Sequence, residues 1–284
     1  MLVAGQSDAE IVTGDTSARE VTRFRPCRAK SHLIQRLGRW LRKRYARLVT
    51  KLWNVSQFCH QFLNDYEPPS DPPALSSADR WILSKCHRLI QRATRLLEEY
   101  DYGIVKTEVE AFFWHDLADN YLEMVKMRLY EGSGEVRDGA RFVLYHVLLS
   151  VIKLFAPFLP FVTERIYWDV FNQSDTSKSL HQSSWPQANS QWISDLADRV
   201  GDELIEIITA VRRFKNENNL KMAEKLKVLQ IVHRDGEIQE RLRQAQLDLM
   251  GVTRAAQVDF SDHVSEDLQI LGGNDRMVIA VAQS

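Results

Sequence analysis

"LRKRYARLVTKLWNVSQFCHQFLN", residues 41–64, carries the periodicity that decides the predicted fold. Its apolar side chains recur at alternating intervals of four and three residues, which places them along one side of an α-helix. They are Leu41, Tyr45, Leu48, Leu52, Val55, Cys59 and Phe62. We therefore expect a long amphipathic helix from about residue 31 to residue 64, buried along this stripe.

A second row of side chains lies beside the apolar stripe when the helix is drawn at about 100° per residue. It consists of Arg44, Arg47, Lys51, Asn54 and Phe58, and it contains no acid. Cations for phosphates, an amide for a base edge and a ring for stacking are the groups that single-stranded RNA recognition uses. The row predicts a nucleic-acid-binding face, and a solvated basic face without a ligand is the alternative.

The charge of the chain is unevenly distributed. Residues 21–64 contain eleven lysines and arginines and no acid, so the remaining residues of this 284-residue chain of net charge −1 carry about −12. A basic patch on an otherwise acidic protein attracts a polyanion at one place and repels it elsewhere. The charge pattern therefore favours an anionic partner, although a disordered basic tail would give a similar composition.

Cysteine usage and the N-terminus point to a cytoplasmic protein. Cys27, Cys59 and Cys86 are widely spaced and form no C-x-x-C pair, so neither a disulfide framework nor a zinc knuckle is predicted. The first twenty residues include early acids and no apolar core of signal-peptide length. We expect no export and no bound metal.

Residues 142–162 approach the length and apolar content of a membrane span. Lys153 and His146 fall inside this stretch, and Pro157 and Pro160 interrupt its end. The neighbouring segments are amphipathic, so we interpret it as a buried helix of a bundle. No contact with a membrane is predicted.

The chain is expected to be mainly α-helical, with an antiparallel helix bundle followed by a small α+β unit. A proline-rich connector follows the first helix, and Ser76 and Asp79 have the spacing of a capping box at the start of the next one. Further helices are predicted near residues 77–100, 104–130, 140–155, 161–171 and 193–216.

The C-terminal residues change in character. "LKVLQIV", "AAQVDF" and "RMVIAVA" are β-like, and "GEIQERLRQAQLDLM" between the first two reads as one helix. The predicted organisation is an irregular segment at 1–29, a helical bundle at 30–192, a connecting helix at 193–219 and an α+β unit at 220–284.

Catalytic motifs are scarce. The sequence contains no glycine-rich phosphate loop, no G-x-S-x-G and no H-E-x-x-H. His115, Asp119 and Glu123 are spaced by four on one predicted helix, but no Glu-x-x-His pair is available to face them. We interpret the three as a polar edge and predict neither a metal site nor a catalytic residue.

Several segments resemble, in order, those of a known family. "KLWNVSQF" looks like the segment that opens the anticodon-binding helical domain of valyl-tRNA synthetases, which are class I aminoacyl-tRNA synthetases. "FFWHDLADNYLEMVKMRLYEG", "LFAPFLPFVTERIY" and "SLHQSSWP" are similar to later segments of the same domain. "VRRFKNENNLKMAEKLKVLQI" resembles the passage into the family's small C-terminal α+β unit, so the resemblance covers about residues 36–284.

The resemblance implies an anticodon-binding module for tRNA, with tRNA(Val) as the expected partner. Lys51, Asn54 and Phe58 match positions that contact anticodon bases or their backbone, and Arg44 and Arg47 extend the same row. Arg212, Arg213 and Lys215 are candidates for further phosphate contacts, although cations near a helix C-terminus also stabilise the helix dipole.

The sequence also departs from the family pattern. Gln57 replaces an arginine, Ala156 replaces the histidine before Pro157, and no nucleotide-binding domain or authentic K-M-S-K-S motif is present. We expect a truncated, split or duplicated tRNA-binding module of a valine--tRNA ligase that is not catalytic by itself. Any ATP would belong to a catalytic domain outside this chain, so no cofactor is predicted here.

Two alternatives remain open. The chain could be the C-terminal half of an active two-chain ligase, completed by a separate catalytic polypeptide, or a degenerate paralogue that acts as an interaction scaffold. Trp53, with Ala46 and Val49, points away from the apolar stripe on the helical wheel. This second face would either pack within the chain or dock a catalytic partner.

Overall fold

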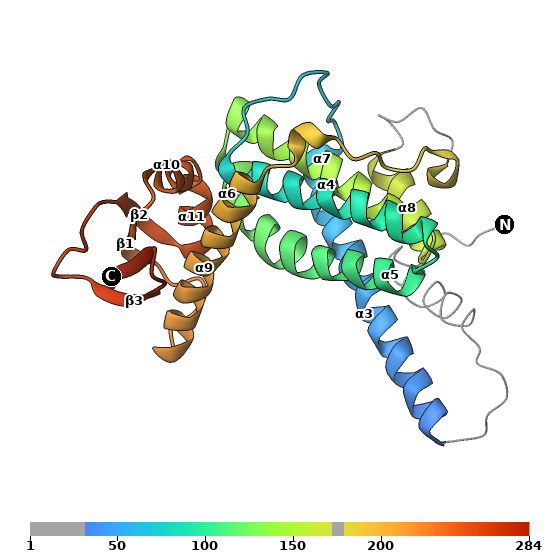
Figure 1. Ribbon diagram of the computed structural model, residues 1–284, viewed down its shortest axis with the longest axis horizontal. Helices are drawn as coiled ribbons and strands as arrows, with labels where there is room; N and C mark the ends of the chain where they lie inside the picture. Colours follow the sequence, from blue (N-terminus) through green and yellow to red (C-terminus); the bar gives the residue numbers. More distant parts are fainter. Residues whose placement is uncertain (1–31, 172–178, 284) are drawn as a thin grey trace.

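The computed structural model describes residues 32–171 and 179–283. Helices of the N-terminal part form an antiparallel bundle, and a small mixed sheet with two helices follows it (Figure 1). The predicted fold class is confirmed. The predicted segment 1–29 lies outside the described residues, and the predicted limits at residues 192 and 219 remain predictions.

The bundle contains α3 (His32–Leu63), α4 (Ser77–Glu98), α5 (Tyr102–Ala111), α6 (Leu122–Glu131), α7 (Glu135–Phe155) and α8 (Pro160–Val170). The apolar stripe of α3 is buried, with Leu48, Leu52 and Cys59 each at most 1% exposed. Helix α7 occupies the predicted apolar stretch and ends at Phe155, just before Pro157. None of the described helices is long and apolar enough to cross a membrane.

The helix predicted at 104–130 is interrupted by an irregularity that its sequence did not reveal. Between α5 and α6, residues Phe112–Tyr121 form a π-helix, η2, whose hydrogen bonds span one residue more than those of an α-helix. In the same segment, the Asn120 side chain donates to the carbonyl of His115, five residues earlier. The backbone turn of η2 is therefore wider than the turns of the α-helices on either side of it.

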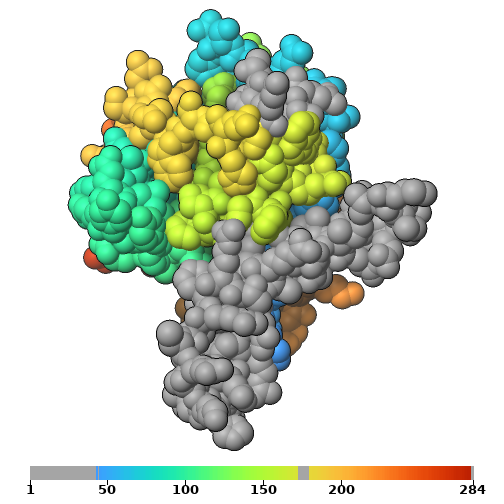
Figure 2. Space-filling model, turned by 90° about the vertical axis from the view of Figure 1, so that its right-hand side faces the viewer, coloured from blue at the N-terminus to red at the C-terminus, as the bar shows by residue number. Residues whose placement is uncertain are grey.

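A connector crosses the outside of the bundle between α8 and the next long helix. It includes the short 3₁₀ turns η3 (Leu180–Gln182) and η4 (Ser190–Trp192), and the Trp185 indole donates to the hydroxyl of Thr94 on α4. Figure 2 shows this connector, in yellow and gold, lying against the bundle surface beside α8. The connector leads to α9 (Asp195–Glu217), which runs from the bundle to the C-terminal unit (Figure 1).

Gly201 allows α9 to approach α4 closely. A Cβ atom at this glycine would lie 1.9 Å from the indole of Trp81, which is fully buried at the crossing. Any larger residue would have to displace the core of the α4 and α9 contact. This contact fixes the start of α9 on the bundle.

The C-terminal unit is a four-stranded sheet with the order β2-β1-β4-β3. Its elements are β1 (Leu226–His233), α10 (Gly236–Gln244), α11 (Gln246–Thr253), β2 (Ala255–Phe260), β3 (Gln269–Gly273) and β4 (Met277–Gln283). Strand β1 pairs in parallel with β2 and antiparallel with β4. The single helix expected at 236–250 is divided at Ala245, and β3 is an additional, largely exposed edge strand.

Arg128 joins the bundle to the C-terminal unit through a buried pair of carboxylates. Its Nη1 and Nη2 donate to both carboxylate oxygens of Asp79 on α4 at 2.8 and 2.7 Å, and its Nε donates to Asp248 on α11 at 2.6 Å. All three side chains are at most 4% exposed. The predicted capping box of α4 is confirmed: Ser76 and Asp79 cap each other, and the Ser76 hydroxyl also donates to Asp248.

The two carboxylates are not equivalent. Asp79 accepts further hydrogen bonds from the Tyr121 hydroxyl and the Ser76 backbone, and Arg128 with these bonds holds the pKa of Asp79 below its ordinary value despite burial. Asp248 has fewer donors, so burial dominates and raises its pKa to about 6. One cation shared by two buried acids thus leaves Asp248 as the carboxyl that binds a proton more readily.

Replacing Arg128 by Met should lower the free energy of unfolding by about 3–5 kcal/mol, because it leaves two buried carboxylates without their shared cation. Urea denaturation measures this loss. Lys126→Met is the matched control: it removes a more exposed cation from the same helix, and its ion pair with Glu123 should be worth no more than about 1 kcal/mol. Similar small losses for both variants would contradict the role assigned to Arg128.

Protonation of Asp248 should also make stability depend on pH. Between about pH 4 and pH 6 the folded protein holds a proton on Asp248 that the unfolded chain has lost, so its contribution to the free energy of unfolding falls as pH rises. The difference in free energy of unfolding between the wild type and Asp248→Asn should decrease through this window and then level off. Urea denaturation at several pH values measures this difference, and a difference that does not change with pH would contradict the assignment to Asp248.

Candidate nucleic-acid interface

The row predicted on α3 keeps its order in the structure. Arg47 and Asn54 are exposed, and Lys51 and Phe58 are half-buried where α3 meets neighbouring elements. Arg44 lies on the same helix, but its side chain is outside the described residues. The structure therefore places Arg47, Lys51, Asn54 and Phe58 at the surface, with their binding role still a prediction.

Lys51 is held by η2. Its Nζ lies 3.2 Å from Oδ1 of Asp119 and 5.2 Å from the centre of the Trp114 ring. The side chains of Lys51 and Asp119 are 32% and 48% exposed, so their ion pair is worth no more than about 1 kcal/mol. The pair holds the Lys51 ammonium at the surface of the bundle, and little free energy is lost if another anion takes the place of the carboxylate.

Phe58 belongs to an aromatic group that the helical wheel did not reveal. Its ring meets Phe62 edge-on at 5.3 Å and Tyr130 at 6.3 Å between centroids. Tyr130, at the end of α6, is 61% exposed, and the Lys126 ammonium lies 5.9 Å from the Phe58 ring centre. Phe58 thus packs against the buried ring of Phe62, and Tyr130 adds an exposed ring beside it.

Arg212 meets the same surface from α9. Its guanidinium donates to the backbone carbonyl of Asp119 at 3.0 Å and to the side-chain oxygen of Asn120 at 3.2 Å. Both acceptors lie in η2, which also holds Lys51. The π-helical segment therefore holds cations from both α3 and α9 through Asp119.

The other two candidates on α9 are placed differently. Arg213 is exposed and pairs with Glu217 one turn later, at 2.8 Å. Lys215 is 1% exposed, and its ammonium donates to the carbonyls of Met222, Glu224 and Thr253. Burial lowers the pKa of Lys215. This geometry assigns the Lys215 ammonium to the junction of α9 with the C-terminal unit, where backbone carbonyls accept its hydrogen bonds.

A cleft of about 810 Å³ opens beside this surface, between α6, α9, α11 and the loop before β1. Its size is within the usual range of ligand sites. The cleft is continuous with the aromatic group through Tyr130 and Lys126, and Arg212 lies on its wall. Its other cationic side chains are Lys215, Lys225 and Arg254, and Met127, Met222 and Met250 supply apolar surface.

Other candidates from the sequence have structural roles. Trp53 and Val49 are 5% and 0% exposed and belong to the core, so a docking face at these residues is excluded. Cys59 and Cys86 are buried free thiols whose pKa burial raises to about 12. Among residues 32–171 and 179–283, no group of three or more His, Cys, Asp or Glu side chains could hold a metal ion.

Comparison with known proteins agrees with the geometry. Residues 79–230 match the family described as the anticodon-binding domain of tRNA ligase. The chain is 36% identical to a valine--tRNA ligase of Thermococcus kodakarensis, 40% to one of Methanopyrus kandleri and 37% to one of Wolbachia pipientis wMel. These matches cover 75% to 76% of this chain and 24% of each relative, so the chain spans about a quarter of their length.

Lys215→Met should lower the free energy of unfolding by about 2–4 kcal/mol, because three buried carbonyls lose a charged donor. Arg213→Met removes a cation that is 77% exposed, two residues away, and should change stability by no more than about 0.5 kcal/mol. Urea denaturation of both variants tests the assignment. A Lys215 variant as stable as the Arg213 variant would be incompatible with it.

Proposed function

Because the chain belongs to the family of anticodon-binding domains of tRNA ligases, we propose that it binds the anticodon arm of a tRNA through α3, η2 and the adjoining part of α9. The observation that carries the proposal is the acid-free row of α3, which meets an exposed aromatic group and Arg212 at η2. We further propose tRNA(Val) as the preferred partner, since the relatives reported above are valine--tRNA ligases.

The contacts divide by chemistry. Lys51 and Arg47 attract the sugar–phosphate backbone, and Asp119 gives up the Lys51 ammonium when a phosphate arrives. Phe58 and Tyr130 offer ring faces or edges to unstacked anticodon bases, and Asn54 supplies an amide that can donate to and accept from a base edge. Arg212 is anchored by two acceptors and extends the positive surface toward the cleft.

Gln57 is half-buried next to Phe58, at a position where the family resemblance leads one to expect an arginine. Because glutamine stands here instead of that arginine, the row has one cation fewer. Base contacts at Phe58 and Asn54 therefore contribute a larger share of the binding free energy. The proposal is one of binding: aminoacylation would require a catalytic domain and ATP, supplied by further chain or by a separate polypeptide.

The proposal is tested by titrating the purified chain with tRNA(Val) and with a non-cognate tRNA at two salt concentrations. Lys51→Ala should weaken binding to both tRNAs and reduce the slope of log affinity against log salt by about 0.7–0.9, the loss expected for one phosphate contact. Phe58→Ala should weaken binding to tRNA(Val) by about 5- to 150-fold, the value of one stacked base, and leave the salt slope unchanged.

Matched controls distinguish these effects from nonspecific ones. Lys227→Ala removes an exposed lysine from β1, and Tyr100→Ala removes a tyrosine that is 76% exposed at the end of α4. Neither lies at the proposed interface, so both should bind as the wild type does. Equal binding to both tRNAs, with Lys51→Ala and Phe58→Ala indistinguishable from these controls, would refute the proposal.

A further inference from the structure

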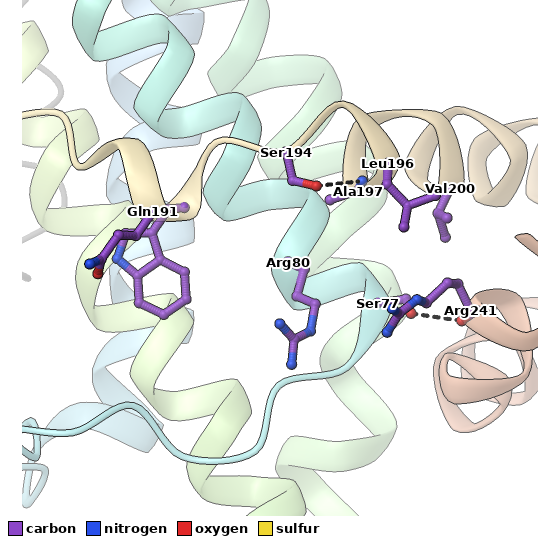
Figure 3. A pocket seen from close by; sticks show the side chains of 9 residues that line it. Ser77, Arg80, Gln191, Ser194, Leu196, Ala197, Val200 and Arg241 are labelled. Carbon is purple, nitrogen blue, oxygen red and sulfur yellow. Dashed lines mark hydrogen bonds between the residues drawn. The ribbon is translucent and has the colours of Figure 1, made fainter. Parts of the chain in front are cut away.

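A second concavity, of about 160 Å³, lies where the bundle, the connector and the C-terminal unit meet. It is bordered by the start of α4, the turn η4, the start of α9 and helix α10 (Figure 3). A single water needs about 10–15 Å³ of such space, so the concavity has room for several waters. This is enough for a phosphate group, which has five heavy atoms.

Two arginines enter this concavity from different parts of the fold. Arg80 comes from α4 and Arg241 from α10, and Figure 3 draws both side chains in the same opening. Within the part of the chain that the structure describes, neither guanidinium has a hydrogen-bonding or ion-pair partner. Arg80 is exposed and Arg241 is half-buried, and an anion between two cations that line one space is attracted by both.

The acids nearest to the concavity are already paired. Asp195 and Asp198, in the first turn of α9, both pair with Arg88, and Asp198 lies 2.6 Å from its Nε. Asp79 and Asp248 behind the start of α4 share Arg128. Among the described residues, neither Arg80 nor Arg241 forms an ion pair with a carboxylate, and the acid one turn before Arg241 on α10 is the exposed Glu237.

The frame around the arginines is rigid. The Ser77 hydroxyl donates to the backbone carbonyl of Arg241 at 2.7 Å, which fixes α10 to the start of α4 (Figure 3). Ser194 caps α9 by accepting from the N–H of Ala197, and its own N–H donates to Ser84 on α4. The N-terminal end of the 23-residue α9, with its positive dipole end, thus borders the same space as the two guanidinium groups.

From this arrangement we infer that the concavity between α4, η4, α9 and α10 binds a phosphate group, held between Arg80 and Arg241. Guanidinium groups match phosphate oxygens with paired, charge-assisted hydrogen bonds, and a site that needs both arginines exists only when the bundle and the C-terminal unit are docked. The phosphate comes either from the backbone of a bound RNA or from a free phosphate in solution.

The site is separate from the proposed anticodon surface. Leu196, which borders the concavity, and Arg212, which meets η2, are 16 residues apart on α9, or roughly 24 Å along the helix. A phosphate in the concavity therefore cannot be the one that meets Lys51. Only the RNA-derived source depends on the proposed function; binding of free phosphate does not.

The test compares the wild-type chain with Arg80→Gln/Arg241→Gln and with a control, Arg95→Gln/Arg199→Gln. The control removes two exposed arginines from α4 and α9 that do not line the concavity, so the change in net charge is equal. Isothermal titration with inorganic phosphate forms one arm. Titration with tRNA(Val) over a range of salt concentrations forms the other.

We expect the wild type and the control to bind inorganic phosphate, and Arg80→Gln/Arg241→Gln to bind it at least about tenfold more weakly, because each arginine contributes charged hydrogen bonds. If RNA is the source, the same variant also lowers the salt slope for tRNA by about 0.7–0.9 relative to the control. An effect on phosphate alone supports the site with free phosphate as its ligand.

Equal behaviour of the two double variants in both arms would overturn the inference. The outcome is independent of the anticodon proposal, because that proposal fails when Lys51→Ala and Phe58→Ala have no effect, whatever phosphate does. Urea denaturation of both double variants shows that they are folded. If Arg80→Gln/Arg241→Gln is destabilised, the single variants Arg80→Gln and Arg241→Gln replace it, each expected to weaken phosphate binding.

Discussion

The shared ion pair of Arg128 with Asp79 and Asp248 is the constraint on which the arrangement of this chain depends. Taking three charges out of water is costly, and the cost is recovered only when α4, α6 and α11 are held in one geometry. The same cluster caps α4 and reaches the C-terminal unit through Ser76. The cleft beside α6 and the concavity at the start of α4 both adjoin this junction.

The proposed function depends on how η2 distributes polar groups. The segment holds the Lys51 ammonium with Asp119 and the Arg212 guanidinium with a backbone carbonyl, so cations far apart in the sequence share one surface. By contrast, the Lys215 ammonium donates its hydrogen bonds to three backbone carbonyls inside the fold. Adjacent basic residues on one helix thus have different roles because their acceptors differ.

Much of the fold could be predicted from the sequence, because it depends on periodicity and local capping. The apolar stripe of α3, the Ser76 and Asp79 cap and the strands β1, β2 and β4 are readable from residue order. The π-helical register of η2, the break at Ala245 and the edge strand β3 depend on tertiary contacts, which single-segment patterns do not contain. For the site, the wheel identified the α3 row but left open whether the face with Trp53 packs within the chain or docks a partner, since it could not show which helices would cover that side.

The π-helix has a consequence for how this protein can change in length. A helix that gains or loses one residue normally turns everything after it by about 100°, which would carry core residues such as Leu129 to the surface. In η2 the extra residue is already absorbed by the wider turn, so the loss of one codon between residues 112 and 121 would restore ordinary helical spacing and leave α6 facing the core. Such a deletion would move Asp119 and Asn120, which accept hydrogen bonds from Arg212. A change of length in this segment would therefore alter the surface while the bundle core stays in place.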